Sequence, residues 1–502
     1  CFLEGWRAET SCMVCVVKVQ GHARLMPACA TRAEDGMVVE SETDEVKAAR
    51  RAALDLLLSE HVGDCEAPCR RACPAHVNIP RMIRQIAEGE HREALITEKR
   101  DIALPAVLGR ICPAPCEKAC RRAPYDAPVA ICLLRRWAAD SDLAPGAPWL
   151  PDCKPASGKK IAIVGAGPAG LSAAYYLLQD GHACRIFDDH EAPGGMLTYG
   201  VPATQLPREV LAAEVDIIRR LGAEFQMKTA VGRDVPFGEI EASFDAVALT
   251  VGALDAARAE GFGVAMAERG IRVAPGSFLT SRARVFAGGD ALQTVRMAVR
   301  AVSHGKAIAL AAGQLLRGEA VTGPAHRFDC RIGRLKDGEM AEFLTEADPG
   351  PRQAPAEKGH GLSEDQAIFE ARRCLRCDCR KADACRLRDQ ADACGASQQR
   401  YPALGRRAAG AGPAGEVDRA PVRRLLDHAE VACEPGKCIK CGLCVQVTER
   451  SGEKLGLGFT GRGYDTQIGV PVNESLVRAI EKDPLRCIEV CPTGALAKRR
   501  GE

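Results

Sequence analysis

The sequence predicts a multidomain α/β protein in which one Rossmann-type domain lies between cysteine-rich segments. Its 502 residues are enough for roughly three or four domains. Residues 159–190 read as strand, glycine turn, helix and strand, which is the pattern of a βαβ unit. The chain has 25 cysteines, yet only Cys184 and Cys330 fall between residues 154 and 373. One α/β core with cysteine groups on both sides is therefore expected.

The charge balance excludes several classes of partner. There are 68 basic and 66 acidic residues, so the net charge of +2 gives no electrostatic reason to bind nucleic acid or an anionic membrane. No apolar run reaches the length of a membrane span, and no signal peptide is visible. We therefore expect a cytoplasmic protein without membrane insertion.

The cysteine spacing indicates metal ligation. A secreted disulfide scaffold is the alternative, but such scaffolds are usually short chains. Here the cysteines stand in tight groups with two to four residues per step. That spacing favours iron–sulfur or other metal sites in a reducing cytoplasm.

Apolar periodicity predicts the main elements outside the βαβ unit. Ser41, three residues before Asp44, is expected to cap the first long helix. Residues 141–158 and 400–420 read as linkers, and residues 318–362 as loops. Strands are expected over 13–19 and 245–251, helices over 41–60, 129–139, 207–221 and 363–373, and a strand–turn–helix over 284–317.

The glycine motif predicts a dinucleotide site. Gly165, Gly167, Pro168, Ala169 and Gly170 follow an apolar strand and open a helix. The glycines allow a tight turn and a close approach to a pyrophosphate, which the helix N-terminus then faces. Asp188 ends the next strand, at the distance where an acid meets a ribose 2′-hydroxyl. The motif alone does not choose between FAD and NAD.

Three further segments resemble the two-dinucleotide-fold flavoproteins, in particular the glutamate synthase small subunit. They are Thr250-Val251-Gly252, a loop containing Gly194, Gly195, Met196 and Leu197, and a turn containing Gly289 and Asp290. The resemblance implies that the Gly165 turn binds FAD, that the Gly194 loop approaches the flavin, and that Asp290 holds the ribityl chain.

The sequence departs from that family between residues 253 and 285. The family inserts a whole NAD(P)H-binding domain there, whereas this chain has about 33 residues and no second glycine fingerprint. A βαβ unit alone needs about 30 residues. We predict that the NAD(P)H domain is absent and that NAD(P)H binds a partner subunit; a cryptic site elsewhere in the chain is the alternative.

The first cysteine group resembles the [2Fe–2S] domain of the complex I large iron–sulfur subunit and of related hydrogenases. It comprises Cys1, Cys12, Cys15 and Cys29. Because Cys1 is the first residue, the elements that normally precede it are missing. We read this as a partial β-grasp domain and expect the [2Fe–2S] cluster in the full-length protein.

The second group resembles the helical two-cluster domain of glutamate synthase small subunits. The resemblance implies two [4Fe–4S] clusters with interleaved ligands: Cys65, Cys69 and Cys120 in one, and Cys73, Cys112 and Cys116 in the other. Two residues could complete the sets. His61 matches the offset of a complex I histidine ligand, with a helix-end histidine as the alternative, and Cys132 is a late ligand or a buried thiol.

The last two groups lie in the C-terminal third. Cys374, Cys377, Cys379 and Cys385, with Cys394 nearby, are expected to hold an iron–sulfur cluster or zinc. Cys438, Cys441, Cys444 and Cys491 resemble a ferredoxin module that keeps one [4Fe–4S] cluster. Cys433 and Cys487 are left over and are read as structural.

These modules predict a soluble FAD and iron–sulfur oxidoreductase subunit with about three [4Fe–4S] clusters, which works with other redox subunits of a complex. No catalytic acid or nucleophile is expected. A glutamate-synthase-type subunit and a zinc-binding scaffold are the alternatives. The expected domains are 1–40 ([2Fe–2S]), 41–145 (helical), 159–320 (FAD-binding Rossmann), 321–400 (linker and cysteine-rich) and 425–502 (ferredoxin-like).

Overall fold

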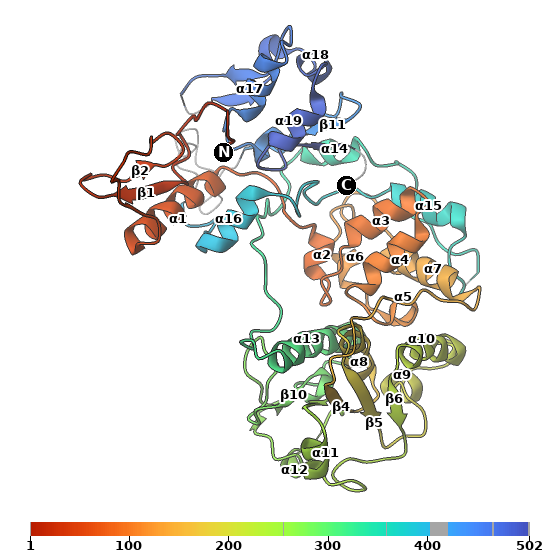
Figure 1. Ribbon diagram of the computed structural model, residues 1–502. Helices are drawn as coiled ribbons and strands as arrows, with labels where there is room; N and C mark the ends of the chain where they lie inside the picture. Colours follow the sequence, from red (N-terminus) through yellow and green to blue (C-terminus); the bar gives the residue numbers. More distant parts are fainter. Residues whose placement is uncertain (1, 255, 358, 402–419, 464–465, 500–502) are drawn as a thin grey trace. The chain divides into compact units, whose positions relative to one another are not determined.

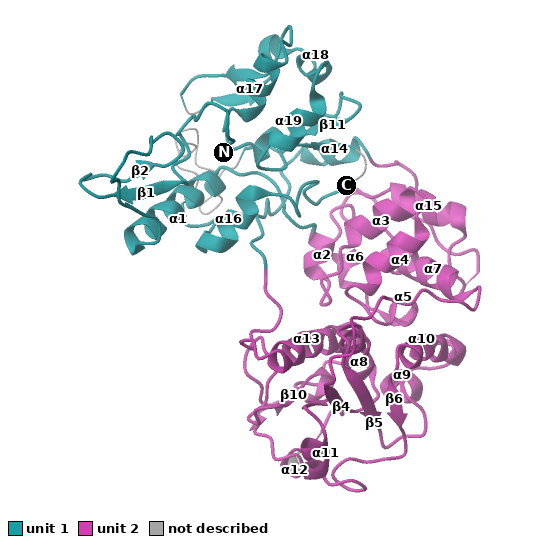
Figure 2. Ribbon diagram, in the orientation of Figure 1, with its two compact units in different colours: residues 1–67, 327–346, 376–502 teal, residues 68–326, 347–375 magenta. Residues whose placement is uncertain are grey.

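A computed structural model describes residues 2–254, 256–357, 359–401, 420–463 and 466–499 (Figure 1). The chain forms two compact units, each built from segments distant in sequence (Figure 2). Unit 1 comprises residues 1–67, 327–346 and 376–502, and unit 2 comprises residues 68–326 and 347–375. This division places the long N-terminal helix in unit 1, whereas the sequence predicted that it would begin the helical domain. The predicted domain limits stay a prediction.

Unit 2 contains a parallel sheet with strand order β10-β7-β4-β5-β6. Its central strands are buried apolar runs, as expected when helices cover both faces. Ile161 and Ile163 of β4 enter one core, and Ala162 and Val164 enter another on the opposite face. The strands are β4 (Lys160–Val164), β5 (Ala183–Phe187), β6 (Glu224–Gln226), β7 (Ala246–Leu249) and β10 (Val285–Ala287).

The predicted helices flank this sheet. Helix α8 (Pro168–Gln179) completes the predicted βαβ unit between β4 and β5, and α10 (Arg208–Arg220) matches the expected helix after it. Helix α13 (Ala298–Leu316) packs along α8. Short helices α9 (Met196–Tyr199), α11 (Phe237–Ser243) and α12 (Ala256–Gly261) complete this part. The predicted Rossmann-type architecture is confirmed.

The second part of unit 2 is helical and packs on the sheet part. Buried Glu214 of α10 accepts hydrogen bonds from the backbone N–H groups of Ala106 and Val107, both at 2.9 Å, at the start of α5. A carboxylate at this position satisfies donors that no residue within the helix can bond. The helices are α2 (Pro68–Ala72), α3 (Ile79–Ala87), α4 (His91–Lys99), α5 (Pro105–Ile111), α6 (Pro115–Lys118), α7 (Ile131–Leu143) and α15 (Glu364–Arg372).

Unit 1 combines a small N-terminal sheet, α1 and a C-terminal module. The sheet has strand order β2-β1-β3, with β1 at Val16–Val19, β2 at Met26–Pro27 and β3 at Val39–Glu40. The C-terminal module pairs β11 (Val431–Cys433) with β14 (Leu496–Lys498) and β12 (Gly458–Thr460) with β13 (Gln467–Gly469). The helices are α1 (Asp44–Ser59), α14 (Glu339–Leu344), α16 (Arg386–Cys394), α17 (Leu443–Arg450), α18 (Leu476–Ala479) and α19 (Pro484–Val490).

Three sequence expectations are corrected. Helix α1 is capped by Thr43, whose side chain accepts the N–H of Val46 at 3.3 Å, so the expected Ser41 cap is wrong. The first strand begins at Val16, because Met13 has a φ of 51° that a strand does not allow. Helix α14 was missed in a stretch expected to be loops, because its six residues are too short for a periodicity signal.

The segment between β7 and β10 is short and irregular. Its described residues form α12 and a two-stranded ribbon of β8 (Met266–Ala267) and β9 (Gly270–Ile271). Within those described residues there is no second βαβ unit. Among the described helices of the whole chain, none is both long and apolar enough to cross a membrane.

The contact between α8 and α13 allows a direct test of packing. A Cβ at Gly305 would lie 2.2 Å from the Ala169 carbonyl oxygen and 2.7 Å from Ser172 Cβ. We expect Gly305→Ala to lower the free energy of unfolding of unit 2 by about 1–3 kcal/mol through overpacking. Chemical denaturation followed by far-UV circular dichroism measures this change.

Gly238→Ala is the matched control. Gly238 also lies in a helix of unit 2, but its Cβ would meet nothing within 4 Å. This change is expected to stabilise by about 0.5–1 kcal/mol, because alanine loses less backbone entropy than glycine. Equal effects of the two substitutions would contradict the packing argument.

Candidate functional sites

The residues predicted to bind a dinucleotide gather at one edge of the parallel sheet. Gly165 follows β4, Asp188 follows β5, Thr250 follows β7, and Gly288 follows β10. All four strands are parallel, so their carboxyl ends lie at the same edge. Ligands of open α/β sheets bind in a crevice at that edge.

The glycine turn between β4 and α8 needs its glycines for different reasons. Gly165 has a φ of 109°, and a Cβ there would lie 2.4 Å from the Thr250 carbonyl oxygen. A Cβ at Gly170 would lie 2.0 Å from the Gly165 carbonyl oxygen. A Cβ at Gly167 would instead point into open space, and no side chain caps α8 at this residue. The first N–H groups of α8 therefore remain available for an anion.

Asp188 shapes the glycine turn from the end of β5. One carboxylate oxygen accepts the Ala166 N–H at 2.6 Å, and the other accepts the His190 N–H at 2.9 Å. The side chain is buried. Contact with a ribose hydroxyl stays a prediction. Each carboxylate oxygen has a further lone pair that could accept a hydroxyl hydrogen bond beside the backbone one.

The loop of Gly194 and Gly195 packs directly on the glycine turn. The Gly194 N–H donates to the Ala166 carbonyl at 2.8 Å, and a Cβ at Gly195 would lie 3.0 Å from Gly167 Cα. Gly195 has φ 54° and ψ −128°, a conformation open only to glycine. Met196, the next residue, is 69% exposed, whereas Leu197 is buried. The loop thus presents Met196 beside the turn.

The turn after β10 is held by His304 of α13. The N–H of Gly289, which has a φ of 70°, donates to His304 Nδ1 at 3.1 Å. Asp290 accepts the N–H of Val295 at 3.2 Å and is partly exposed. Burial, together with the nearby charge of Arg300, lowers the pKa of His304 to about 4. His304 is therefore neutral near pH 7 and can accept this hydrogen bond.

One cysteine group of unit 2 lies around a buried arginine. The Cys132 and Cys112 side chains are hydrogen-bonded, Cys132 also contacts Cys116, and Cys73 interacts electrostatically with Cys112. The Arg135 guanidinium lies near Cys73, Cys116 and Cys132 and pairs with Glu98 at 2.8 Å. Arg135 Nη2 is buried without a hydrogen-bond partner among the described residues. An unsatisfied cationic donor beside four thiols suits a negatively charged cluster.

Three other cysteines of unit 2 pack against its main core: Cys69, Cys120 and Cys374. The segments that carry Cys120 and Cys374 are joined, because Arg122 Nη1 donates to the Arg373 carbonyl at 2.6 Å. Cys374 therefore lies in unit 2, whereas Cys377, Cys379 and Cys385 lie in unit 1.

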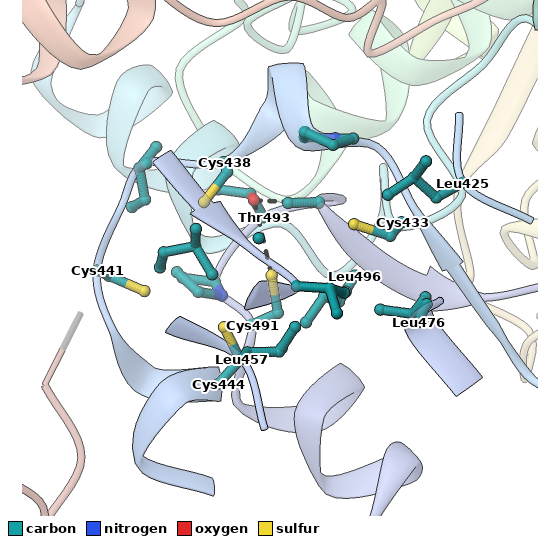
Figure 3. A pocket seen from close by; sticks show the side chains of 17 residues that line it. Leu425, Cys433, Cys438, Cys441, Cys444, Leu457, Leu476, Cys491, Thr493 and Leu496 are labelled. Atoms are coloured by element: carbon teal, nitrogen blue, oxygen red, sulfur yellow. Dashed lines mark hydrogen bonds between the residues drawn. The ribbon is translucent and has the colours of Figure 1, made fainter. Parts of the chain in front are cut away.

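The C-terminal module of unit 1 gathers Cys438, Cys441, Cys444 and Cys491. They line one pocket with apolar residues of the same module, and Figure 3 shows Cys433 on another side of it, beside Leu425. The Lys440 N–H donates to Cys438 Sγ at 3.3 Å. Hydrogen bonds to ligand sulfur are one means of tuning a cluster's potential.

The N-terminal group is described except for Cys1, which lies outside the described residues. Cys29 is hydrogen-bonded to Cys15 and interacts electrostatically with Cys12. The Ala28 N–H donates to the Cys15 carbonyl at 3.2 Å, which joins the two segments beside β1. The structure thus brings the three described members together.

Cys65 lies against Cys330 within unit 1. The Cys65 N–H donates to the Cys330 carbonyl, and the Cys330 N–H donates to Cys65 Sγ. The expected set of Cys65, Cys69 and Cys120 and the expected set of Cys374, Cys377, Cys379 and Cys385 each include residues of both units, so both sets stay predictions. Cys330 was missed, because it stands alone in sequence and no spacing points to it.

His61 is not shown next to a cysteine group. Its Nδ1 atom is buried and has no hydrogen-bond partner among the described residues, and its charged neighbours are Lys437 and Glu434. Burial lowers the pKa of His61 to about 4, and Lys437 adds to this shift. Ligation by His61 stays a prediction.

Four family models match different parts of the chain. The matches confirm the predicted [2Fe–2S], helical iron–sulfur and ferredoxin-like modules and the Rossmann-type fold. The families are the 2Fe-2S iron-sulfur cluster binding domain (4–44), dihydropyrimidine dehydrogenase domain II with its 4Fe-4S cluster (41–147), the NAD(P)-binding Rossmann-like domain (163–215) and the ferredoxin-like domain of NADH-quinone oxidoreductase subunit 3 (429–497).

Curated relatives agree with these matches. The chain is 41% identical over 207 residues to the NADP(+)-dependent formate dehydrogenase subunit beta of Moorella thermoacetica, covering 37% of this chain and 29% of the relative. It is 42% identical over 189 residues to the NADPH-Fe(3+) oxidoreductase subunit beta of Geobacter sulfurreducens, covering 37% and 28%. It is 38% identical over 194 residues to the glutamate synthase small chain of Escherichia coli, covering 38% and 41%.

The last similarity confirms the predicted resemblance to glutamate synthase small subunits. The chain spans less than half the length of each of these relatives. All three relatives are named as subunits or chains of oxidoreductases, in line with the predicted class of enzyme.

The neutral His304 gives a prediction for pH. Its pKa is about 4 in the folded state, against about 6.5 when unfolded. The stabilisation is therefore fully present above pH 6.5 and is lost as the pH falls towards 4. Between pH 7 and pH 5 the free energy of unfolding should fall by about 2 kcal/mol from this group alone.

His304→Gln tests the assignment. The glutamine oxygen can accept the Gly289 N–H and does not titrate, so the variant should lose less stability between pH 7 and pH 5 than the unsubstituted chain. Denaturation at both pH values measures the difference. An identical pH dependence in the two proteins would show that His304 is not the titrating group.

Proposed function

We propose that this chain is an FAD- and iron–sulfur-containing electron-transfer subunit of a multi-subunit oxidoreductase. It exchanges electrons between a flavin on the sheet part of unit 2 and clusters held by its cysteine groups. The observation that carries the proposal is that one cysteine group and the dinucleotide site are joined within unit 2 by consecutive residues of α13.

Ser303, His304 and Gly305 make that connection. Ser303 Oγ donates to the carbonyl of Pro74 at 2.8 Å, and Pro74 directly follows Cys73. His304 accepts the N–H of Gly289. Gly305 packs on the carbonyl of Ala169 in the first turn of α8, directly after the glycine turn. A cluster ligand and both dinucleotide turns are thus attached to one rigid helix.

The residues at the sheet edge fit FAD. The N-terminus of α8 and the open space at Gly167 suit a pyrophosphate. By the resemblance to glutamate synthase small subunits, the Gly194 loop would approach the flavin ring and Asp290 would hold the ribityl chain. Bound FAD would supply two-electron and one-electron chemistry, which clusters cannot do alone.

The cysteine groups fit iron–sulfur clusters. Cys73, Cys112, Cys116 and Cys132 supply four thiolates, and Arg135 offers them a positive charge. Cys438, Cys441, Cys444 and Cys491 supply another four. Each set matches the four cysteine ligands of a [4Fe–4S] cluster. Cys12, Cys15 and Cys29 supply three of the four ligands of a [2Fe–2S] cluster.

Pyridine nucleotide is proposed to bind a partner subunit. The described residues between β7 and β10 form one short helix and a small ribbon, which leaves no room for a second nucleotide-binding βαβ unit there. The substrate of the complex is proposed to be oxidised or reduced on other redox subunits, in the cytoplasm.

Two alternatives give different outcomes. A glutamate-synthase-type subunit would take electrons from NADPH itself, and a zinc-binding scaffold would contain zinc with neither iron nor flavin. Anaerobic purification followed by iron, zinc and flavin analysis separates them. Zinc without iron, or a chain without flavin, would overturn the proposed function.

A cysteine substitution tests the Cys73 group. Cys112→Ser should remove about four iron atoms per chain, because it removes one of four cluster ligands. Flavin should be retained, since Cys112 lies in the helical part of unit 2. Iron analysis and electron paramagnetic resonance of the dithionite-reduced protein measure the loss.

Cys184→Ser is the control for this substitution. Cys184 is buried, lies on β5 of the same unit and belongs to no cysteine group. Its iron content should equal that of the unsubstituted chain. Loss of iron from both variants would mean that buried serine, not ligand removal, causes the effect.

The flavin of the isolated chain should not be bleached by NADPH or NADH, because the described chain offers no second nucleotide fold. Absorbance near the flavin maximum under anaerobic conditions measures this, with dithionite as the positive control. Rapid stoichiometric bleaching by NADPH would show that this chain binds the nucleotide and would favour the glutamate-synthase-type alternative.

A further inference from the structure

We infer that Cys65, Cys330, Cys379 and Cys385 of unit 1 hold an additional [4Fe–4S] cluster, which exchanges electrons with the ferredoxin-type site of the same unit. The second half of this statement rests on the proposed function; the metal site itself does not. These four cysteines are called the tetrad below. Three of them, all but Cys65, lie outside every segment matched by a family model.

Chain connections bring the tetrad together. The Cys65 N–H donates to the Cys330 carbonyl at 3.1 Å, and the Cys330 N–H donates to Cys65 Sγ at 3.3 Å. The Cys379 N–H donates to the Cys65 carbonyl at 3.2 Å. Cys385 belongs to the same buried cluster as Cys65 and Cys330. Five of the six pairs of tetrad thiols interact electrostatically.

The tetrad is buried, and its surroundings suit a cluster. The four cysteines are between 1% and 8% exposed. Leu54, Leu58 and Leu387 pack around three of them. A Cβ at Gly494 would lie 2.2 Å from Cys379 Sγ, so only glycine leaves this sulfur its space.

Two cationic side chains approach the tetrad. Arg388 of α16 interacts electrostatically with Cys65 and bonds to Glu66 at 2.7 Å. Lys437 interacts with Cys379 and pairs with buried Glu434. Buried cations beside thiolates offset the negative charge that four thiolates bring to a metal centre.

The neighbouring redox-type site favours a cluster over a single ion. Four thiolates can hold either zinc or a [4Fe–4S] cluster. The C-terminal module of the same unit matches the ferredoxin-like domain of NADH-quinone oxidoreductase subunit 3, and its Pro492 carbonyl oxygen lies 3.8 Å from Cys385 Sγ. A cluster beside such a site can exchange electrons with it, whereas zinc has no redox chemistry.

Direct contacts join the tetrad to the ferredoxin-type site. Cys385 Sγ lies 3.8 Å from the carbonyl oxygen of Pro492, the residue after Cys491. The Leu387 N–H donates to the same carbonyl at 3.3 Å. Ile439, next to Cys438, packs against the apolar clusters around both sites. A pocket lined by Cys12, Cys15 and Cys29 also reaches Ile439 and Pro492.

The proposed exchange is a single-electron step. The ferredoxin-type cluster loses one electron and passes from the reduced to the oxidised state, and the tetrad cluster gains that electron. No bond forms or breaks, and no proton is required. Oxidation of the tetrad cluster by the same route reverses the step.

The test uses the full chain, purified anaerobically. Cys330→Ser and Cys385→Ser should each lose about four iron atoms per chain and one signal of the reduced clusters in electron paramagnetic resonance. The flavin content and the signal of the ferredoxin-type site should remain. Cys184→Ser is the control, because it places serine at a buried position outside the cysteine groups, and it should keep all its iron.

Three results would overturn the inference. One is unchanged iron in both folded variants. Another is the loss of one zinc per chain with iron unchanged, which would make the tetrad a zinc site. The third comes from crystals of the unsubstituted chain, where iron-edge and zinc-edge anomalous scattering identify the metal even if both variants fail to fold: an iron peak at the tetrad supports the inference, and its absence overturns it.

The outcome is distinguishable from failure of the proposed function. If the chain binds flavin and the ferredoxin-type site holds iron while the tetrad does not, only this inference fails. If the chain holds neither flavin nor iron at any group, the proposed function fails. If the tetrad holds iron but its signal is unaffected by the reduction of the neighbouring site, the electron exchange is wrong and the metal site stands.

Discussion

The close contact between α8 and α13 in unit 2 is the constraint on which the proposed function depends. Gly305 allows the two helices to touch at Ala169, in the first turn of α8 directly after the glycine turn. The residues just before it, Ser303 and His304, then reach the backbone beside Cys73 and the turn after β10. A larger side chain at Gly305 would separate the helices and disturb all three connections at once.

In the proposed function, no catalytic acid or nucleophile is required. Flavin and clusters would carry the chemistry, and the protein would position them and adjust their electrostatic surroundings. Buried charges make that adjustment, since Arg135 stands beside the Cys73 group, and Arg388 and Lys437 stand beside the tetrad. Each is paired with a carboxylate, as a buried charge requires.

Local signals in the sequence predicted the sheet part well. The glycine turn, α8 and β5 were foreseen because the turn residues, the apolar strand and the helix period agree within about 30 residues. The error in the helix cap was also local. Thr43 caps α1 in place of Ser41, since either side chain could accept an N–H and only the path of the backbone selects between them.

The sequence by itself determined that this protein carries cysteine groups of metal-binding type around one dinucleotide fold, because both signals depend on residues close together in the chain. Only the tertiary structure decided that Cys330 joins a cysteine group. It lies against Cys65, which is 265 residues away. A metal centre needs ligands that meet in space, and a spacing rule cannot find a ligand that long-range backbone pairing brings in alone.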